Sequence, residues 1–582
     1  MKKFTFLLSL LLAFVGVTAS AQGFKISDAP DGENWATNTQ WYLIKTAATD
    51  GWHPTAGYLS TDAAYISDAD IRTDIATLPT NDNGLWCIVG NESSGYKIYN
   101  KAEGTSKVLG FSAASSFARM YETSAEGVTS DFDLASSTYA TTPWAGCVKK
   151  HGTNAWLNNA NKNQNRNLCC LGTWENSAST TALLGNAFYF IPVNNVGEAS
   201  TAVETFMKGQ EHYIIMNRYK VIPGVSDACS SEDAAYTKNP SDETFNSFID
   251  AAKKHLAKTY FTITNCRTNY SLRVLSANTT NASALSVDEK KSNASALWQF
   301  VPIESGFKLY NANAKAYLGA LVGTNSNTSM NADLEQGGLY SISVNTSGTV
   351  DGFVLRDGNN GRMNLEGDGR VDAWEGQAGF YNQVTWAIDP ATEIEVALNT
   401  LGSKSYATTY LPFGVSAVKD AKAYSAATPA DGQTIMTETA NFAKETGVLL
   451  VSDEAADKAV LTIGDVEGAT NTSALKGTLL AKDITDAQAK YLVFGKNKAN
   501  ETEVGFFEPS TTVTSIPANR AFFADAEGSA IALNFGNVTA VNNVVAGNAN
   551  ANAPIFDLSG RRVVKAVKGG LYIQNGKKYI VK

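Results

Sequence analysis

The chain carries one pattern twice, as LWCIV at residues 85–89 and as LWQFV at residues 297–301. Each copy is followed by a segment with the order Gly, aromatic, Lys, aliphatic, Tyr, Asn, at residues 95–100 and 306–311, and then by a segment that ends in Leu-Gly. The spacing in the two copies differs by only one or two residues. Self-similarity of this kind predicts a duplicated module.

The two copies also resemble each other at their ends. Each begins with a run of β-forming residues, WYLI at 41–44 and YFTI at 260–263, and each closes with an aromatic and aliphatic run. Short apolar runs divided by Gly, Asn, Asp and Ser are typical of all-β folds with many short strands. The sequence therefore predicts a mostly β protein with two such modules, at residues 22–200 and 259–390.

Residues 1–21 have the features of a secretory signal peptide. Two lysines precede an apolar run at residues 4–17, and Ala-Ser-Ala at residues 19–21 supplies the small side chains that signal peptidase requires. We expect cleavage near Ala21 and export of the mature protein. No later stretch is apolar over the length that a membrane-spanning helix needs, so we expect no spanning segment.

A different periodicity separates the two modules. Apolar side chains recur at helical spacing over residues 203–216, and a second helical stretch that opens at Ser241 places Phe245 and Phe248 on one face. These patterns predict a helical connector over residues 201–258. An apolar stripe of this kind is more typical of a packing face than of a binding groove.

The chain becomes β-rich again after the second module. Runs such as GVLLV at residues 447–451 alternate with turn residues, which predicts a β-sandwich-like domain over residues 391–544. Residues 545–554 consist mostly of Ala, Asn and Gly, so we expect a flexible linker there. Residues 555–582 hold short β runs, two of which flank Asn575-Gly576, a pair that favours a two-residue hairpin turn.

Composition excludes several classes of partner. The formal net charge is −9 and both signs of charge are spread along the chain, so the sequence lacks the basic patch that nucleic acids or anionic membranes require. The histidines His53, His151, His212 and His255 are scattered, and no cysteine pair has zinc-type spacing beside them. We therefore expect no metal site and no cofactor. The six cysteines are too few for a disulfide scaffold in a chain of this length.

A sugar site needs an aromatic ring to stack on a pyranose and Asp, Asn or Gln side chains to bond its hydroxyls. Trp86 and Trp298 lie inside apolar runs, and we expect them in the core rather than in such a site. The best combinations elsewhere are Trp156, Asn158 and Trp174 in the first module, and Asn364, Asp372 and Trp374 in the second.

The duplicated segments around Trp86 and Trp298 resemble those of ricin-type β-trefoil lectins. The resemblance implies two β-trefoil-like modules that bind glycans or glycoproteins. A Gln-x-Trp motif is typical of each lobe in that family, whereas Gly84 and Ala296 stand two positions before the tryptophans here. The following segment, with YLPF at residues 410–413 and IPAN at residues 516–519, is similar to a β module that commonly precedes bacterial sorting tails.

The end of the chain resembles the C-terminal sorting tail of the type IX (Por) secretion system. The resemblance rests on FDLSGRRV at residues 556–563, GLYI at residues 570–573 and the Lys-rich ending from Gly576. It implies that the secretion machinery recognises residues 555–582, that the protein crosses the outer membrane, and that it stays at the outer cell surface.

The sequence predicts an exported, cell-surface, non-catalytic protein that binds carbohydrate or glycoprotein. Two alternatives remain open. One is a secreted glycoside hydrolase or another hydrolase, with Glu366 and Asp368, or Asp372 and Glu375, as paired carboxylates. The chain contains no Gly-x-Ser-x-Gly or His-Glu-x-x-His motif that would support such an activity. The other alternative is a structural or adhesive surface protein whose modules do not bind sugar.

Overall fold

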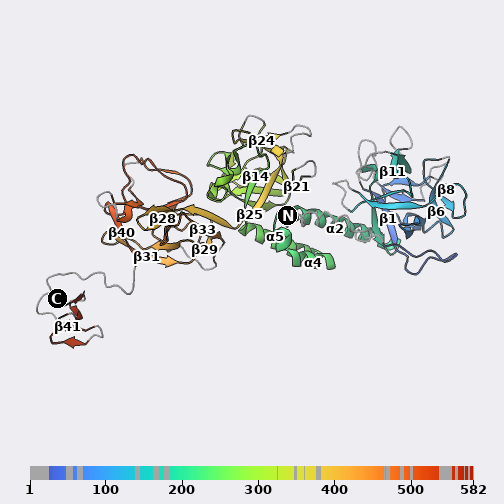
Figure 1. Cartoon of the computed structure of the whole chain (residues 1–582). Helices are drawn as coiled ribbons and strands as arrows, with labels where there is room; N and C mark the ends of the chain where they lie inside the picture. The colour runs from blue at the N-terminus through green and yellow to red at the C-terminus, as the bar shows by residue number, and fades with distance from the viewer. Residues whose placement is uncertain are drawn as a thin grey trace. The chain divides into compact units, whose positions relative to one another are not determined.

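A computed structural model of the chain is shown in Figure 1. The predicted signal peptide, residues 1–21, and all but the last residue of the predicted linker, residues 545–554, lie outside the described residues. The described residues are 25–47, 57–61, 70–113, 115–137, 144–161, 169–175, 184–323, 326–345, 350–359, 361–374, 382–464, 466, 472–485, 490–497, 503–535, 554–557, 561–565, 567–568, 570–574 and 577–580.

The strands of the first module, here called module 1, form a closed barrel. They are β1 (Trp41–Thr46), β2 (Tyr58–Ser60), β3 (Arg72–Ile75), β4 (Trp86–Asn91), β5 (Gly95–Asn100), β6 (Lys107–Ser112), β7 (Arg119–Glu122), β8 (Val128–Thr129), β9 (Phe132–Ser136), β10 (Gly146–Lys150), β11 (Ala155–Asn161), β12 (Cys169–Glu175) and β13 (Phe188–Val193). Antiparallel pairing runs in a ring through β1, β4, β5, β9, β10 and β13 and returns to β1. The hairpins β2–β3, β6–β7 and β11–β12 leave this ring at three places.

The second module, module 2, repeats this topology. Its strands are β14 (Tyr260–Asn265), β15 (Leu272–Ala277), β16 (Ala282–Ser286), β17 (Leu297–Ile303), β18 (Gly306–Asn311), β19 (Ala316–Leu318), β20 (Met330–Asn331), β21 (Tyr340–Val344), β22 (Phe353–Asp357), β23 (Arg362–Leu365), β24 (Val371–Trp374) and β25 (Trp386–Ala391). The ring passes through β14, β17, β18, β21, β22 and β25. The hairpins are β15–β16, β19–β20 and β23–β24. A closed barrel with three hairpins, built from three four-stranded lobes, is the β-trefoil arrangement, so the predicted fold class is confirmed.

One buried aromatic residue recurs in each lobe of module 2. The indole N–H of Trp298 donates to the Leu275 carbonyl at 2.9 Å, and that of Trp386 donates to the Met363 carbonyl at 2.9 Å. In the middle lobe the hydroxyl of Tyr340 donates to a backbone carbonyl in the same way. All three side chains are fully buried. Because a buried indole or hydroxyl must keep a hydrogen-bond partner, each aromatic residue ties its barrel strand to the hairpin of its own lobe.

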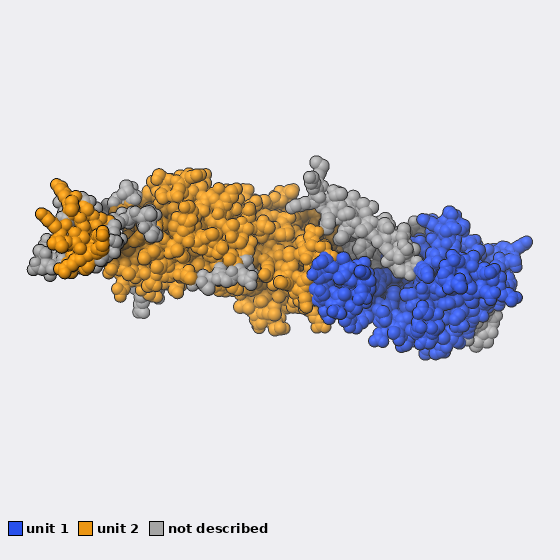
Figure 2. Space-filling model, turned by 90° about the horizontal axis from the view of Figure 1, so that it is seen from below, with its two compact units in different colours: residues 1–219, 231–249 blue, residues 220–230, 250–582 orange. Residues whose placement is uncertain are grey.

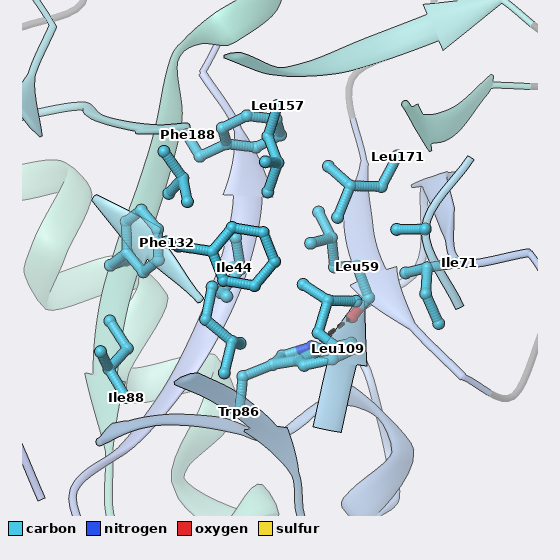
Figure 3. Packing of buried hydrophobic residues seen from close by; sticks show 14 of the residues in the cluster. Ile44, Leu59, Ile71, Trp86, Ile88, Leu109, Phe132, Leu157, Leu171 and Phe188 are labelled. Carbon is cyan, nitrogen blue, oxygen red and sulfur yellow. Dashed lines mark hydrogen bonds between the residues drawn. The ribbon is translucent and has the colours of Figure 1, made fainter. Parts of the chain in front are cut away.

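Module 1 has the same type of hydrogen bond at Trp86, whose indole N–H donates to the Leu59 carbonyl at 3.0 Å (Figure 3). Figure 3 shows side chains from barrel strands, such as Ile44 and Phe132, and from hairpins, such as Leu59 and Leu171, in the same core as Trp86. Their burial removes apolar surface from water, which is the main stabilising contribution to such a fold. The residues of this core are Tyr42, Ile44, Leu59, Ile71, Trp86, Ile88, Ile98, Leu109, Phe111, Ala118, Phe132, Val148, Leu157, Leu171, Phe188 and Phe190.

Helices occupy the chain between the two modules. They are α2 (Ala199–Lys220), α3 (Val225–Ala228), α4 (Ser230–Lys238) and α5 (Asp242–Lys258). The start of α2 packs on module 1, where the ring of Phe206 lies 5.6 Å from those of Trp144 and Tyr189. The imidazole of His212 stacks on Phe245 of α5 at 3.9 Å. The apolar stripe predicted for α5 is therefore a packing face, with Phe248 fully buried.

Two compact units divide the chain within these helices (Figure 2). The first contains residues 1–219 and 231–249, and the second contains residues 220–230 and 250–582. Module 1, α2 up to Tyr219, nearly all of α4 and the first half of α5 belong to the first unit, and module 2 with the rest of the β structure belongs to the second. No helix among the described residues combines the length and the apolar character that crossing a membrane requires.

The β domain after module 2, here called the third domain, contains a short sheet, a long sheet and a two-stranded sheet formed by β35 and β38. Its strands are β26 (Glu393–Ala397), β27 (Asn399–Leu401), β28 (Lys404–Thr409), β29 (Val415–Lys419), β30 (Lys422–Ala426), β31 (Gln433–Thr439), β32 (Val448–Ser452), β33 (Lys458–Ile463), β34 (Lys476–Thr478), β35 (Lys482–Asp483), β36 (Tyr491–Lys496), β37 (Val504–Phe507), β38 (Ser515–Ile516), β39 (Arg520–Ala524) and β40 (Ala530–Asn534). The short sheet has the order β26-β33-β29, and the long one has the order β27-β28-β32-β30-β31-β40-β37-β36-β39-β34.

The apolar run at residues 447–451 explains how this domain holds together. Strand β32 is buried throughout, and its alternate side chains enter two different cores. Val448 and Leu450 pack in one core with residues of the short sheet, whereas Leu449 and Val451 pack in the other with residues of the long sheet. A strand that is covered on both faces reads as a continuous apolar run rather than as an alternating one.

Module 2 and the third domain share a core and a polar seam. Leu297 of β17 packs in the same cluster as Leu450. The Asn519 amide donates to the Asn313 side chain at 2.7 Å, and the Asn313 amide donates to the Leu479 carbonyl at 2.9 Å. Module 2 is thus continuous with the third domain within the second unit.

The C-terminal residues form a small separate sheet. Its strands are β41 (Ile555–Phe556), β42 (Arg562–Val563), β43 (Leu571–Gln574) and β44 (Lys577–Ile580), in the order β42-β41-β43-β44. Gln574 pairs with Lys577, as expected for a hairpin with a two-residue connection. The described residues of this segment therefore form the small β tail that the sequence predicts.

Candidate functional site

Strand register brings the candidate tryptophans into two equivalent rows of side chains. In module 1, Asp133 of β9 pairs with Lys149 of β10, Lys149 pairs with Trp156 of β11, and Trp156 pairs with Trp174 of β12. Directly paired residues of antiparallel strands place their side chains on the same face of the sheet. We call these four residues the module 1 row; the structure describes the side chains of Asp133, Lys149 and Trp156.

Module 2 has a row at the same place in its topology. Ser341 of β21 pairs with Arg356 of β22, Arg356 pairs with Arg362 of β23, and Arg362 pairs with Trp374 of β24. We call these four residues the module 2 row. In both rows the second strand supplies a cation and the fourth supplies a tryptophan. The sequence analysis missed the cations Lys149, Arg356 and Arg362, because they pair with the tryptophans only through the fold.

The module 1 row combines an acid, a cation and an aromatic ring. The ammonium of Lys149 lies 5.7 Å from the ring centre of Trp156, which is only 8% exposed. Lys149 also forms an ion pair with Asp133, with 3.4 Å between Nζ and Oδ2. The Nδ1 atom of His151, just beyond β10, lies 2.5 Å from Asp133 Oδ1.

Two opposing effects determine the pKa of Asp133. Burial raises this pKa, but the hydrogen bonds from His151, the backbone N–H of Gly152 and Lys149 outweigh burial, so the pKa is lowered below its ordinary value. Asp133 is therefore ionised at neutral pH. It can accept hydrogen bonds, while Lys149 can donate them, on the same face of the module.

The module 2 row carries two cations and no carboxylate. Arg356, Arg362 and Trp374 are all partly exposed. Burial, and then the neighbouring charge of Arg362, lower the pKa of Arg356. Two guanidinium groups therefore lie on paired strands beside an aromatic ring, which concentrates positive charge on this face of module 2.

The structure places the six predicted sugar-binding residues in different environments. Trp156, Trp174 and Trp374 belong to the rows, although the side chain of Trp174 lies outside the described part of the chain. The other three, Asn158, Asn364 and Asp372, are 7%, 0% and 0% exposed.

The buried polar residues hold the third-lobe hairpins together. Asn158 donates to the Asn186 side chain at 2.7 Å. Asn364 of β23 donates to Asp372 of β24 at 2.8 Å and to Glu366 at 2.9 Å. Asn364 and Asp372 face each other across the hairpin, next to the pair formed by Arg362 and Trp374. Because residues i and i+2 of a strand share a face, their hydrogen bond lies beside the Arg362 and Trp374 pair of the module 2 row.

The residues proposed for hydrolytic chemistry are engaged elsewhere. Asp368 forms an ion pair with Arg370 at 2.7 Å, Glu366 accepts from Asn364, and Asp372 is fully buried. Glu375 lies outside the described residues. Burial raises the pKa of Cys87 to about 12 and also that of Cys147 to about 12, so neither thiol is a reactive thiolate.

Among the described residues, no group of three His, Cys, Asp or Glu side chains is arranged to hold a metal ion.

No protein-family model and no curated protein sequence matches the chain. Among solved structures, a mosquitocidal holotoxin aligns with 84% of this chain and 52% of its own, at 11% identity and a TM-score of 0.25. The haemolytic lectin CEL-III aligns with 76% of this chain and 96% of its own, at 9% identity and a TM-score of 0.19. The designed three-fold symmetric protein ThreeFoil aligns with 26% of this chain and 96% of its own, at 14% identity and a TM-score of 0.19.

The chain spans about half the length of the holotoxin. Overall similarity at these scores carries no argument about function. The β-trefoil assignment stands instead on the closed rings and hairpins of modules 1 and 2.

Proposed function

We propose that the protein is an exported, cell-surface, non-catalytic glycan-binding protein whose ligands contact the two rows. The observation that carries this proposal is the placement of Trp374 and two arginines on one partly exposed face, at the position where module 1 has Trp156 and Lys149. An aromatic ring with hydrogen-bonding groups beside it is what recognition of a pyranose requires.

The charges of the rows favour different sugars. The module 1 row offers an acceptor at Asp133 and a donor at Lys149, a combination that suits the hydroxyls of a neutral sugar. The module 2 row offers the guanidinium groups of Arg356 and Arg362 and the exposed hydroxyl of Ser341 beside Trp374, a cationic set that suits a carboxylated or sulfated sugar. Two sites on one chain would add avidity wherever a glycan surface can engage both.

Export and surface retention are part of the same proposal. The signal-peptide pattern of residues 1–21 supports passage across the inner membrane, and the resemblance of residues 555–582 to a type IX sorting tail supports recognition by that secretion machinery. A binding protein at the cell surface would meet glycans of other cells or of the medium.

A glycan array probed with the chain from Gln22 to Lys582 tests the binding proposal. We expect the chain to bind acidic glycans. Trp374→Ala should lower the affinity for these glycans by about tenfold, because it removes a stacked aromatic contact. Phe535→Ala is the matched control, because Phe535 of the third domain is 37% exposed and lies outside both rows.

Equal binding by Trp374→Ala and the parent chain would contradict the proposed site. A folded protein that binds no glycan on a broad array would favour the structural or adhesive alternative.

A further inference from the structure

The third domain contains a cavity of about 460 Å³ that is separate from both rows. Strands β28, β36, β38 and β39 contribute most of its walls, which lie within the second unit. A volume of this size is typical of sites for small molecules. The walls are mainly apolar, with Leu401, Tyr406, Val493, Phe494, Ile516 and Pro517 among them.

Arg520 of β39 also lines this cavity. One of its guanidinium nitrogens, Nη1, donates to the Thr408 carbonyl at 3.0 Å. The backbone N–H of Ala521 donates to the Thr408 hydroxyl at 3.2 Å, so β28 holds both the backbone and the head group of this arginine in place. Arg520 is thus a positioned residue rather than a solvent-exposed chain.

The ion pairs that involve acidic residues of the third domain do not include Arg520. They join Lys404 to Asp453, Lys422 to Glu438, Lys458 to Glu395, Lys490 to Glu508 and Lys315 to Glu445. Among the described residues no carboxylate lies within ion-pair distance of Arg520.

A guanidinium carries five N–H donors and stays charged, so one bond to a carbonyl leaves most of its donors unused. Burial of the group lowers the pKa of Arg520, and no nearby carboxylate opposes this shift. A partly desolvated cation without an anion is costly, which makes the cavity electrostatically complementary to a negative ligand.

We propose that this cavity binds a small carboxylic acid with an apolar body, whose carboxylate pairs with Arg520. The planar guanidinium matches the two oxygens of a carboxylate. The apolar body would lie against Tyr406 and Phe494, whose ring centres are 5.4 Å apart. Val513 at the lining is 43% exposed, so an apolar side chain already faces solvent at this cavity.

Titration calorimetry of the chain from Gln22 to Lys582 with octanoate, 1-octanol and octylamine tests the proposal. We expect saturable binding of octanoate and at least about tenfold weaker binding of the alcohol and of the amine, because only the carboxylate can pair with the guanidinium. Equal binding of octanoate and octanol would overturn the proposal, since the cavity would then be recognising apolar surface alone. Absence of saturable octanoate binding would overturn it as well.

Arg520→Gln locates the site, because it keeps a donor amide but removes the charge. We expect it to weaken octanoate binding by about tenfold or more while octanol binding stays unchanged. Arg370→Gln, which removes a partly exposed arginine of module 2, is the matched control and should leave octanoate binding intact. Unchanged octanoate binding by Arg520→Gln would overturn the proposal.

A second variant keeps the test independent of the stability of Arg520→Gln. Val513→Trp adds bulk at an exposed position of the lining and leaves the guanidinium in place. We expect it to weaken octanoate binding by about tenfold through loss of space. Unaltered affinity in a folded Val513→Trp chain would place the ligand outside this cavity.

Discussion

The module 1 row and the module 2 row occupy the same strands of the same topology, yet they differ in charge. Asp133, Lys149 and Trp156 in one become Ser341, Arg356 and Arg362 in the other. Strand pairing sets where these side chains stand, whereas residue type sets what they can bind. Duplication of one barrel topology therefore allows two surfaces to diverge on equivalent strands.

The largest expected effect is the loss of stability when the buried tryptophan of either module is removed. Trp298→Ala should lower the free energy of unfolding of module 2 by about 3–5 kcal/mol, because it leaves a cavity and removes the hydrogen-bond donor of the Leu275 carbonyl. Trp86→Ala should have a similar effect on module 1. Scanning calorimetry should show that Trp298→Ala lowers the transition of module 2 together with the third domain, since they share a core. A Trp298→Ala transition confined to module 2 would show that the shared core is not cooperative.

The second prediction reverses the charge of one row. Arg362→Glu should weaken binding of acidic glycans by about ten- to a hundredfold, because it replaces a hydrogen-bond donor by a carboxylate that repels the negatively charged ligand. Binding of neutral glycans through the module 1 row should not change. Lys422→Glu, an exposed charge reversal in the third domain, is the control for net charge. An equal loss in the control would mean that total charge, not the row, governs binding.

The third prediction uses pH and applies to the module 1 row. Because the folded-state pKa of Asp133 is lowered, its stabilising contribution is present above its unfolded-state pKa of about 3.9 and is lost as the pH falls through the folded-state value. Asp133→Asn should cost about 1 kcal/mol at pH 7 and less at pH 3. Urea unfolding at both pH values measures this difference. If the loss of unfolding free energy caused by Asp133→Asn does not depend on pH, it arises from packing rather than from the charge of Asp133.

The smallest expected effect concerns Lys149 and Trp156. Lys149→Met keeps the aliphatic stem over the ring but removes the ammonium, and should lower stability by about 0.5 kcal/mol. A double-mutant cycle with Trp156→Leu isolates this coupling from the ion pair to Asp133. Additive effects in the cycle would indicate that the cation and the ring do not interact.

Much of the fold follows from local sequence alone. The duplicated runs at residues 85–89 and 297–301 predict two equivalent barrels, and Trp86 and Trp298 are buried in them as expected for tryptophans inside apolar runs. The run at residues 447–451 likewise predicts a strand, whereas the structure adds that both of its faces are covered. Apolar periodicity is a local property, so it can be recognised without knowing which strands pair.

Side-chain neighbours across strands could not be predicted in this way. Asn364 and Asp372 are polar residues near a tryptophan, which suggested a sugar site, but cross-strand pairing buries them against each other. Lys149 and Arg356 gave no signal in the sequence, because only register brings them beside Trp156 and Arg362. A shift of one residue in the pairing would have placed each of them on the opposite face.

By itself, the sequence determined the class of the fold, the duplication and the core tryptophans, because apolar patterning along the chain reports burial directly. Tertiary structure alone decided the composition of the two rows, the continuity of module 2 with the third domain through Leu297, and the placement of Arg520 in an apolar cavity. These features depend on residues that are distant in the chain, and only closed strand pairing and packing bring such residues together.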